Sequence, residues 1–479
     1  MSERFFKRST VVALIVAGAF FMEYIDSTVI ATALPMMART FHANPVALSI
    51  GLTAYLLTLV VFIPVSSWIA DRFGTRSVFT SAMTVFTLAS VLCGLSEGVG
   101  EFVAARVLQG IGGAMMVPVG RMVVLRTTEK KDLISAIALL TWPALAAPIL
   151  GPPLGGLICT YWSWRWIFLL NVPLGLAGIL AALKLMPNIR AEERRPFDPL
   201  GFLMTGSALA CVMYGVDRIG NVGSIWSLPT FLLMAGVVLG MASVRHLRRH
   251  PTPVIDLWPM RVPTFAATTW GGSLFRMTIS SAPFLMPLML QVGFGMSALT
   301  SGGLTLWIFI GNFGMKAVTT PILKRFGFRT TLVVNGAATA ISILACSFLF
   351  PSTPTWILAA VLCFGGLCRS MQFTAISSLS YADIPPDRMS GASSFGSLIQ
   401  QMSLGMGVAA GALALHIAMA FHGHAGEPLT ADFQLAFALL AVVAALGLIS
   451  FLRLDPSAGA DVSGHRPEER RGRQPTGAG

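Results

Sequence analysis

The sequence predicts an all-α integral membrane protein with 14 transmembrane helices, arranged as two six-helix bundles plus a two-helix insert. Hydrophobic residues make up 54% and charged residues 11% of the 479 residues, and the mean hydropathy is +0.73. A soluble protein of this size needs more charge to cover its surface. Apolar segments of spanning length also recur fourteen times, and a basic turn is repeated eight segments apart.

The predicted spans are apolar runs of 18 or more residues, which is enough for a helix that rises 1.5 Å per residue to cross the hydrocarbon core. Their even number places both ends of the chain on the same side of the membrane. The runs lie at 10–33, 47–70, 77–96, 102–124, 134–158, 165–186, 200–219, 228–245, 265–291, 299–322, 331–350, 355–378, 391–419 and 433–452.

The distribution of lysine and arginine predicts the orientation. Most basic residues lie in alternate segments between the spans, whereas only Arg39, Arg165 and Arg218 lie in the segments on the opposite side. By the positive-inside rule, both termini are therefore cytoplasmic. The N-terminal basic residues and apolar run imitate a signal peptide, but the run is too long and carries acids, so we interpret it as an uncleaved first span.

An internal repeat predicts the domain organisation. The turn Arg72-Phe73-Gly74-Thr75-Arg76 follows the second span, and Arg325-Phe326-Gly327-Phe328-Arg329 follows the tenth. Such repeats are typical of secondary transporters, which bind their substrates near the membrane midplane between the repeats. We therefore predict an N-terminal bundle at 1–186, a linker with two inserted helices at 187–263, a C-terminal bundle at 264–455 and a disordered cytoplasmic tail at 456–479.

Several classes of function are not predicted. Despite a formal net charge of +12, the basic residues form no patch interleaved with aromatics, so no nucleic-acid partner is expected. The six cysteines show no disulfide or zinc spacing. The chain has no nucleotide-binding loop or Ser/His/Asp arrangement, so no enzyme activity and no cofactor are expected. No metal site is predicted either, since His422, His424 and Glu427 lack a fixed helical spacing.

Two carboxylates in the first span need a functional explanation. Glu23 lies near the middle of this span, and Asp26 follows at a spacing of three, so both share one helical face. A carboxylate inside the hydrocarbon costs about 3 kcal/mol or more, and such residues face a cavity or a partner. Arg106, counted inward along the fourth span, lies at a depth comparable to that of Asp26, which makes an ion pair geometrically plausible.

Several motifs follow one another along the first six spans. They are Leu34-Pro35, the loop Ser67 to Arg76, Arg106-Val107-Leu108-Gln109-Gly110, Gly151-Pro152-Pro153-Leu154-Gly155-Gly156, and Trp164-Arg165-Trp166-Ile167-Phe168 with Asn171-Val172-Pro173 and Gly175. With these features the sequence resembles the major facilitator superfamily, and specifically its fourteen-helix drug:proton antiporter branch, and the resemblance runs from the first span to the last. Ser67 and Ala147 stand where the family usually has glycine, and Thr75 where it has arginine.

The resemblance implies a proton-coupling role for Asp26, Glu23 and Arg106. In one interpretation, ionised Asp26 pairs with Arg106, and protonation releases the pair and alters the packing of spans one and four. The alternative is a static ion pair that holds the two helices together. Glu23 is a candidate for meeting a substrate cation or relaying a proton, or else it is a carboxyl kept neutral by burial. Gln109 is a further candidate substrate contact.

Two groups of residues are candidates for conformational control. Asp71, with Arg72 and Arg76, could cap a helix start and pair with basic groups of a neighbouring loop, forming a cytoplasmic gate; otherwise the loop only sets topology. Gly151, Pro152, Gly155 and Gly156 resemble the antiporter motif, which implies a seal against proton leak. The alternative is a packing kink without that role.

The second half carries three intramembrane cations, Arg276, Lys316 and Arg369, and no deep acid. They are candidate substrate contacts, since an arginine fork suits a carboxylate or phosphate. Pairing of Glu23 with Arg276 or Arg369 would neutralise part of the excess charge. Alternatively, Lys316 extends toward the cytoplasm and the arginines bind exposed carbonyls.

The predicted function is proton-coupled export of small, lipophilic, drug-like compounds across the cell inner membrane by alternating access. The alternative is export of an anionic metabolite, a carboxylate or its metal chelate. The expected partners are the small-molecule substrate, protons and the lipid bilayer. A monomer is expected, and the sequence leaves a periplasmic adaptor open.

Overall fold

The computed structural model describes residues 8–42, 45–191, 196–218, 227–423 and 428–465, and within these ranges the regular structure is entirely helical. The described chain forms two compact units. Unit 1 comprises Met1–Thr128, Leu139–Trp258 and Pro385–Met402, and unit 2 comprises Glu129–Ala138, Pro259–Ile384 and Ser403–Gly479.

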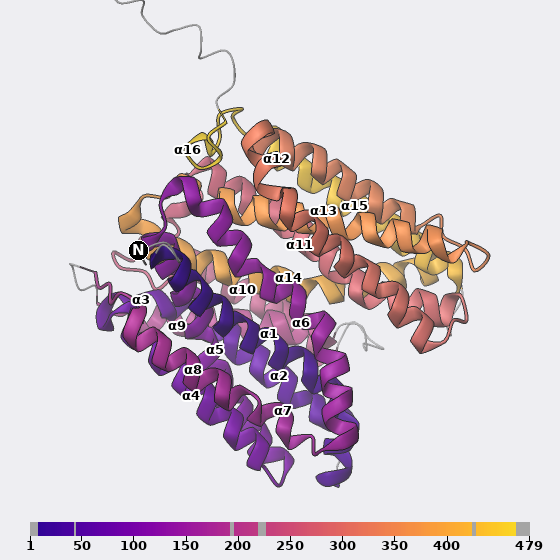
Figure 1. Ribbon diagram of the computed structural model, residues 1–479, viewed down its shortest axis with the longest axis horizontal. Coiled ribbons are helices and arrows are strands. Elements are labelled where there is room, and N and C mark those ends of the chain that lie inside the picture. Colours follow the sequence, from indigo (N-terminus) through magenta and orange to yellow (C-terminus); the bar gives the residue numbers. More distant parts are fainter. Residues whose placement is uncertain (1–7, 43–44, 192–195, 219–226, 424–427, 466–479) are drawn as a thin grey trace, which may run out of the picture. The chain divides into compact units, whose positions relative to one another are not determined.

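Unit 1 is built from the first ten helices and the beginning of α14 (Figure 1). These helices are α1 (Arg8–Thr40), α2 (Pro45–Phe62), α3 (Ser66–Phe73), α4 (Thr75–Leu95), α5 (Val99–Thr127), α6 (Leu133–Tyr161), α7 (Arg165–Leu169), α8 (Asn171–Leu185), α9 (Pro199–Arg218) and α10 (Leu228–Arg249). Helix α5 packs against α2 and α4, α1 packs against α5 and α8, and α9 and α10 form an antiparallel pair.

Unit 2 contains the later helices, drawn from pink to yellow in Figure 1. They are α11 (Pro263–Leu288), which continues into a π-helical turn at Met289–Gly293, α12 (Ala298–Cys346), α13 (Thr355–Ala382), the remainder of α14 (Met389–Phe421), α15 (Thr430–Leu452) and the short α16 (Ala460–Ser463). Helix α12 packs along α13 and α15, and α11 packs against α13 and α15.

Twelve helical segments of the described residues are long and apolar enough to cross a membrane. Two features explain why these twelve segments differ in number from the fourteen predicted spans. The predicted spans at 299–322 and 331–350 are joined in the 49-residue helix α12, which is interrupted by non-helical dihedrals at Gly327 (φ 73°). The predicted fifth span is α6, which is not among the twelve. The count of fourteen and the cytoplasmic termini therefore stay predictions.

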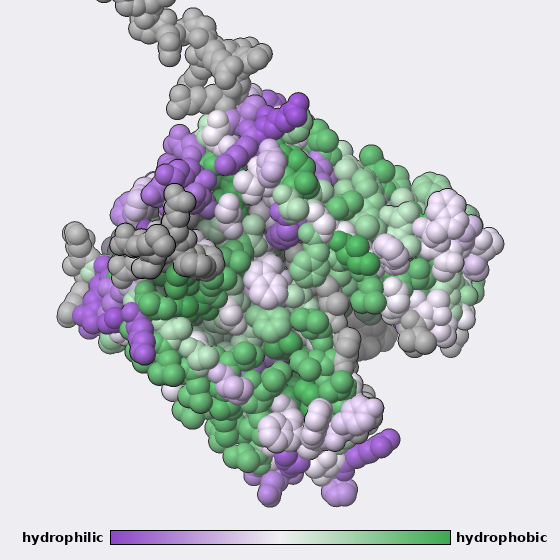
Figure 2. Space-filling view, viewed as in Figure 1, coloured by the Kyte–Doolittle hydropathy of each residue, from purple (hydrophilic) through white to green (hydrophobic). Residues whose placement is uncertain are grey.

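The lipid-facing character of the helices is visible on the surface. Apolar side chains cover much of the face shown in Figure 2. On α10, Phe231, Met234 and Met241 are each more than 60% exposed. Exposed apolar surface of this extent is what a bilayer covers, since a soluble chain rarely leaves such continuous patches open.

Proline and glycine explain the breaks on either side of α3. Pro64 lies in a short 3₁₀ segment, Ile63–Val65, that separates α2 from α3, because proline cannot supply the helical N–H bond. Gly74 (φ 96°) separates α3 from α4 in a conformation that favours glycine. A Cβ at this position would also collide with the side-chain amide of Asn188.

An aromatic cluster fixes where α8 begins. Trp164, 2% exposed, donates from Nε1 to Thr40 Oγ1 at 3.1 Å. Phe102 lies with its ring centroid 5.8 Å from that of Phe168 and 6.3 Å from that of Phe41. These contacts join α7 to α1 and α5, and they position Asn171, the first residue of α8, over the polar interior of unit 1.

Candidate functional site

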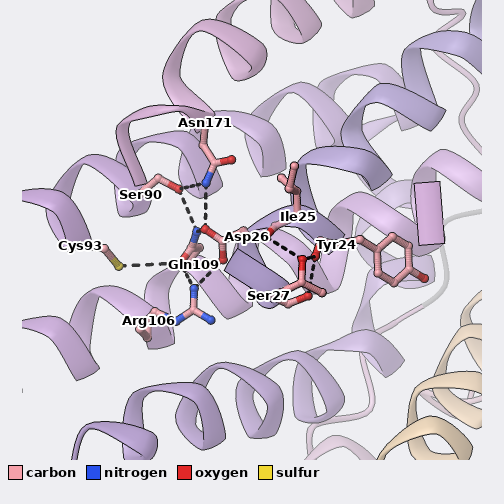
Figure 3. Close-up of polar contacts among 10 residues, drawn as sticks. Tyr24, Ile25, Asp26, Ser27, Ser90, Cys93, Arg106, Gln109 and Asn171 are labelled. Atoms are coloured by element: carbon pink, nitrogen blue, oxygen red, sulfur yellow. Dashed lines mark hydrogen bonds and ion pairs between the residues drawn. The ribbon is translucent and has the colours of Figure 1, made fainter. Parts of the chain in front are cut away.

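Asp26 is the centre of a buried polar network in unit 1 (Figure 3). Its Oδ2 accepts a hydrogen bond from Arg106 NH1 at 2.7 Å, and its Oδ1 accepts from Gln109 Nε2 at 3.0 Å and from Asn171 Nδ2 at 2.8 Å. Asp26 is 1% exposed and Arg106 is fully buried. Three donors on one carboxylate stabilise its ionised form in this arrangement.

The network is completed by α4 and by the spacing of residues on α5. Arg106 and Gln109 are three residues apart and therefore lie on one face, where Arg106 NH1 donates to Gln109 Oε1 at 2.6 Å. Ser90 Oγ accepts from Gln109 Nε2 at 2.8 Å and from Asn171 Nδ2 at 3.1 Å. We call Asp26, Ser90, Arg106, Gln109 and Asn171 the Asp26 network.

Tyr55 on α2 extends the network towards Glu23. The guanidinium carbon of Arg106 lies 4.3 Å from the centroid of the Tyr55 ring, which is a cation–π contact. The Tyr55 hydroxyl and the Glu23 carboxyl both border Gly113, where a Cβ would lie 3.2 Å from Tyr55 Oη and 3.7 Å from Glu23 Cδ. Glycine at 113 thus leaves space for both groups beside α5.

Glu23 lies on the same face of α1 as Asp26 but in a different environment. It is 7% exposed, and its Oε2 has no hydrogen-bond partner among the described residues. Arg121 on α5 is near enough to act on the Glu23 charge. Both carboxylate oxygens of Asp26 therefore accept hydrogen bonds, whereas Oε2 of Glu23 has no donor among the described residues.

The arrangement allows a change of hydrogen bonding on protonation. A protonated Asp26 would lose the charge that attracts Arg106 and could no longer accept three hydrogen bonds with full strength. Arg106 Nε and NH2 have no hydrogen-bond partner in the described structure. These N–H groups of Arg106 can therefore donate to another acceptor once the Asp26 charge is neutralised.

The three cations of the second half lie on separate helices of unit 2. Arg276 on α11 is 7% exposed, and its NH1 lies near Gly272, one turn earlier. Lys316 on α12 donates from Nζ to Thr374 Oγ1 at 2.8 Å. Arg369 on α13 borders a small cavity of about 60 Å³ together with Thr339, Ser342 and Cys346. Since Glu23 belongs to unit 1, its predicted pairing with Arg276 or Arg369 stays a prediction.

The predicted gate residues do not form one cluster. Asp71 lies within α3 rather than at a helix start, and its Oδ1 is 3.5 Å from Arg126 NH2 in the last turn of α5. Arg72 is exposed and lies over the rings of Trp68 and Phe73. The backbone N–H of Arg76 donates to Asn188 Oδ1 at 3.1 Å. The acid thus pairs with a basic residue within another helix, where pairing with basic groups of a neighbouring loop was predicted, and it does not cap a helix.

A second set of contacts joins α5 and α3 to the start of α14 within unit 1. Arg121 donates to Ser397 Oγ at 3.2 Å and to Gln400 Oε1 at 3.1 Å. Ser66 Oγ and Ser394 Oγ are 2.8 Å apart. Sequence analysis did not single out Arg121, because its contacts with α14 join residues more than 270 positions apart.

The glycine motif of α6 lies against α1. A Cβ on Gly151 would collide with the Thr28 side chain, whereas one on Gly156 would meet nothing within 4 Å. Thr28 Oγ1 also donates to the carbonyl of Ala147 at 3.2 Å, one turn before Gly151. Gly155 is buried. The backbone of Pro152 is part of α6, but its side chain lies outside the described residues.

Several residues of the site were not predicted from the sequence. Ser90 and Tyr55 were not singled out, and Asn171 appeared only as part of a motif. A polar residue in an apolar segment was the available signal for Ser90 and Asn171. Sequence analysis also missed Asp198, His246 and His250, whose ligand atoms lie within 4.8 Å of one another. Of the three residues considered for a metal site, His422 pairs with Asp432 at 2.7 Å, and His424 and Glu427 lie outside the described residues.

A large polar cavity lies in unit 1 next to the predicted gate. Its volume is about 740 Å³, and its lining includes Asp71, Arg126, Arg190, Asp198, Asp256 and Arg388. Arg388 NH1 lies 3.3 Å from Asp256 Oδ2, so this wall contains a second ion pair besides that of Asp71 and Arg126.

The chain is similar in sequence to known proteins over most of its length. The family model described as Major Facilitator Superfamily matches residues 16–408. A protein of Serratia proteamaculans that carries the multidrug resistance protein name MdtD is 35% identical over 442 residues, which is 92% of each chain. Its namesake from Salmonella typhimurium is 36% identical over 448 residues, covering 92% of this chain and 94% of the relative.

Two solved structures share the fold. The human organic anion transporter MFSD10 (TETRAN) superposes with a TM-score of 0.69 at 14% identity, covering 92% of this chain and 99% of that chain. The proton:xylose symporter XylE superposes with a TM-score of 0.66 at 13% identity, covering 94% and 97%. At such low identity the likeness shows the fold alone.

Proposed function

Because the chain belongs to the Major Facilitator Superfamily and is therefore a transporter rather than an enzyme, we propose that it is a proton-coupled antiporter. It exports small, lipophilic, drug-like compounds across the inner membrane by alternating access. The observation that carries the proposal is the buried carboxylate of Asp26 with its three donors, one of them Arg106.

Asp26 is assigned the proton-coupling role because its protonation removes the negative charge from the buried ion pair with Arg106. An uncompensated charge in this interior costs several kcal/mol, so loss of the Asp26 charge drives Arg106 to seek another acceptor. Movement of Arg106 shifts α5, on which Gln109 and Arg121 also lie. The proton thereby acts on the packing of α1, α4, α5 and α8.

Glu23 is assigned to the substrate or to a proton relay. It is buried, its Oε2 has no hydrogen-bond partner among the described residues, and its carboxyl lies with the Tyr55 hydroxyl beside Gly113. A lipophilic cation would supply the missing positive charge. The MdtD relatives, named for multidrug resistance, favour a substrate of the drug-like class.

The test is transport by the full chain in proteoliposomes with an imposed pH gradient, with internal pH followed while lipophilic cations and organic anions are added. Substrate-dependent proton flux that is lost in Asp26→Asn supports antiport. Substrate movement without proton flux would overturn it. Glu23→Gln is the matched variant: if Glu23 recognises cations, it loses transport of cationic compounds and keeps that of neutral ones.

Export of an anion is the second candidate. Arg369 makes no ion pair in the described part of the chain, and it borders a small, mainly apolar cavity whose lining also includes the hydroxyl side chains of Thr339 and Ser342. A carboxylate could supply the missing countercharge through the guanidinium fork. Arg369→Gln, compared with Arg276→Gln, tests this: selective loss of anion transport supports the second candidate, and unchanged anion transport rejects it.

A further inference from the structure

The inserted helices α9 and α10 carry a cluster of ligand atoms that the proton-coupling site does not use. Asp198 immediately precedes α9, His246 lies in the last turn of α10, and His250 follows the end of α10. One ligand atom from each residue lies within 4.8 Å of the others. Because the histidines are four residues apart at a helix end, their rings lie on one face, with centroids separated by 5.1 Å.

Asp198 is held firmly by hydrogen bonds. Its side chain is 2% exposed, and its Oδ1 accepts from the Gly201 N–H at 2.8 Å, as a helix N-cap does. His246 Nε2 lies 3.0 Å from Oδ1 and 3.2 Å from Oδ2. Both carboxylate oxygens therefore lie beside the His246 imidazole.

His250 brings its Nδ1 close to this carboxylate. The Thr252 N–H donates to His250 Nδ1 at 3.3 Å, so Nδ1 is the unprotonated nitrogen in this hydrogen bond. The same Nδ1 lies 3.9 Å from Asp198 Oδ2. A metal ion bound to both atoms would take up the Nδ1 lone pair, so metal binding would replace the long hydrogen bond from Thr252.

We propose that Asp198, His246 and His250 form a binding site for a divalent transition-metal ion of the zinc type. Two imidazoles and one carboxylate are a ligand set that zinc favours, with water in the fourth position. At bond lengths of about 2.0–2.2 Å, ligands of a tetrahedral ion lie roughly 3.4 Å apart. Asp198 Oδ2 lies 3.2 Å from His246 Nε2 and 3.9 Å from His250 Nδ1, which brackets that value, and the three ligand atoms lie within 4.8 Å of one another. Side-chain rotations that bring the two imidazoles closer together would complete the site.

The site is accessible from the polar cavity of unit 1. Asp198, Thr252 and Val254 line that cavity, whose volume is about 740 Å³. The side chains of His246 and His250 are 20% and 30% exposed. The cavity lining contains four aspartates and four arginines, so its formal charge does not exclude a cation.

A bound ion would fasten the beginning of α9 to the end of α10. Asp198 Oδ2 also lies 3.4 Å from the N–H of Val254, in the segment that leads towards α11. The metal would therefore fix both ends of the inserted helix pair where the chain passes from the insert to unit 2. This role is independent of the proton-coupling residues on α1, α4, α5 and α8.

The test is zinc binding to the purified full chain after removal of any affinity tag and treatment with a chelator. We expect one zinc ion per chain after desalting, and we expect His246→Gln and His250→Gln each to weaken zinc binding at least about tenfold in competition with a chromogenic chelator. His422→Gln is the matched control, because His422 also pairs with a buried carboxylate, Asp432, but lies outside the cluster.

Folding is monitored separately. The wild type and both histidine variants should unfold at similar temperatures in chelator, and added zinc should raise the unfolding temperature of the wild type only, since a ligand that binds the native state stabilises it. Equal zinc binding by the wild type and the His246→Gln/His250→Gln double variant would overturn the proposal. So would loss of the ion in His422→Gln.

Discussion

The ring of Tyr55 lies 4.3 Å from the guanidinium carbon of Arg106, and Arg106 in turn donates to Asp26 at 2.7 Å. An arginine is thus held between an aromatic face and a carboxylate inside a helical bundle. The contact connects α2 to the α1–α5 ion pair, and the hydroxyl end of the same ring reaches the space beside Glu23. Tyr55 is therefore the residue through which the two acids of α1 can influence each other.

Two substitutions of Tyr55 should distinguish the contribution of its ring from that of its hydroxyl. Tyr55→Phe keeps the cation–π contact, whereas Tyr55→Leu removes it, at a cost of about 2 kcal/mol for a desolvated pair. We expect Tyr55→Leu to lower the unfolding temperature and proton-coupled transport more than Tyr55→Phe does, measured by thermal unfolding and by proton flux in proteoliposomes. Equal effects of the two variants would mean that the hydroxyl, not the ring, matters.

Asn171 should tune the pH at which transport occurs. Asn171→Ala removes one of the three donors to Asp26, and a hydrogen bond to a charged group contributes about 1.5–3 kcal/mol. Because the carboxylate keeps only two of its three donors in this variant, we expect the midpoint of the pH profile of transport to move to higher pH.

The control for Asn171 is Ser90→Ala. Ser90 accepts from Gln109 and Asn171 but makes no direct hydrogen bond to Asp26. Loss of the Ser90 hydroxyl in Ser90→Ala should shift the midpoint of the pH profile of transport less than Asn171→Ala does. A larger shift in Ser90→Ala would contradict the assignment of Asn171 as a direct positioning residue for Asp26.

The glycine motif of α6 offers a matched pair of substitutions. Gly151→Ala places a methyl group against Thr28 of α1, whereas Gly156→Ala meets open space. Overpacking of a close contact costs about 1–3 kcal/mol. We expect Gly151→Ala to lower the unfolding temperature and to reduce transport or to increase substrate-independent proton leak. Gly156→Ala should leave all three unchanged; similar results for both would show that close packing at 151 is unimportant.

The Asp26–Arg106 pair could be anticipated from the sequence because depth along two helices can be counted in residues. Asn171 could not, since its position depends on the break between α7 and α8 and on the packing of Trp164 and Phe168. Tyr55 carried no signal beyond being an aromatic residue in an apolar helix. Rotation of a helix about its axis, which decides these contacts, is set by packing and not by local sequence.

Long sequence separations explain the other omissions. Asp198 and His246 are 48 residues apart, and only the α9–α10 pair brings them together. Asp71 is followed directly by a basic turn, so Arg72 and Arg76 were its obvious companions, whereas the ion pair is made by Arg126 from the end of α5. Directly adjacent residues do not face each other on a helix, so Asp71 cannot pair with Arg72 and finds its partner on another helix.

The Asp71–Arg126 pair yields the last prediction. The two side chains are 29% and 12% exposed, so their interaction should be modest, no more than about 1 kcal/mol. In a double-mutant cycle of Asp71→Asn and Arg126→Gln, transport rates should be non-additive, because the second substitution removes a partner already lost. Arg72→Gln should be additive with Asp71→Asn, since Arg72 lies over aromatic rings instead of contacting the acid. If transport rates are instead non-additive for Asp71→Asn with Arg72→Gln and additive for Asp71→Asn with Arg126→Gln, the turn that follows Asp71 forms the gate. The ion pair between Asp71 and Arg126 would then be rejected as the gating contact.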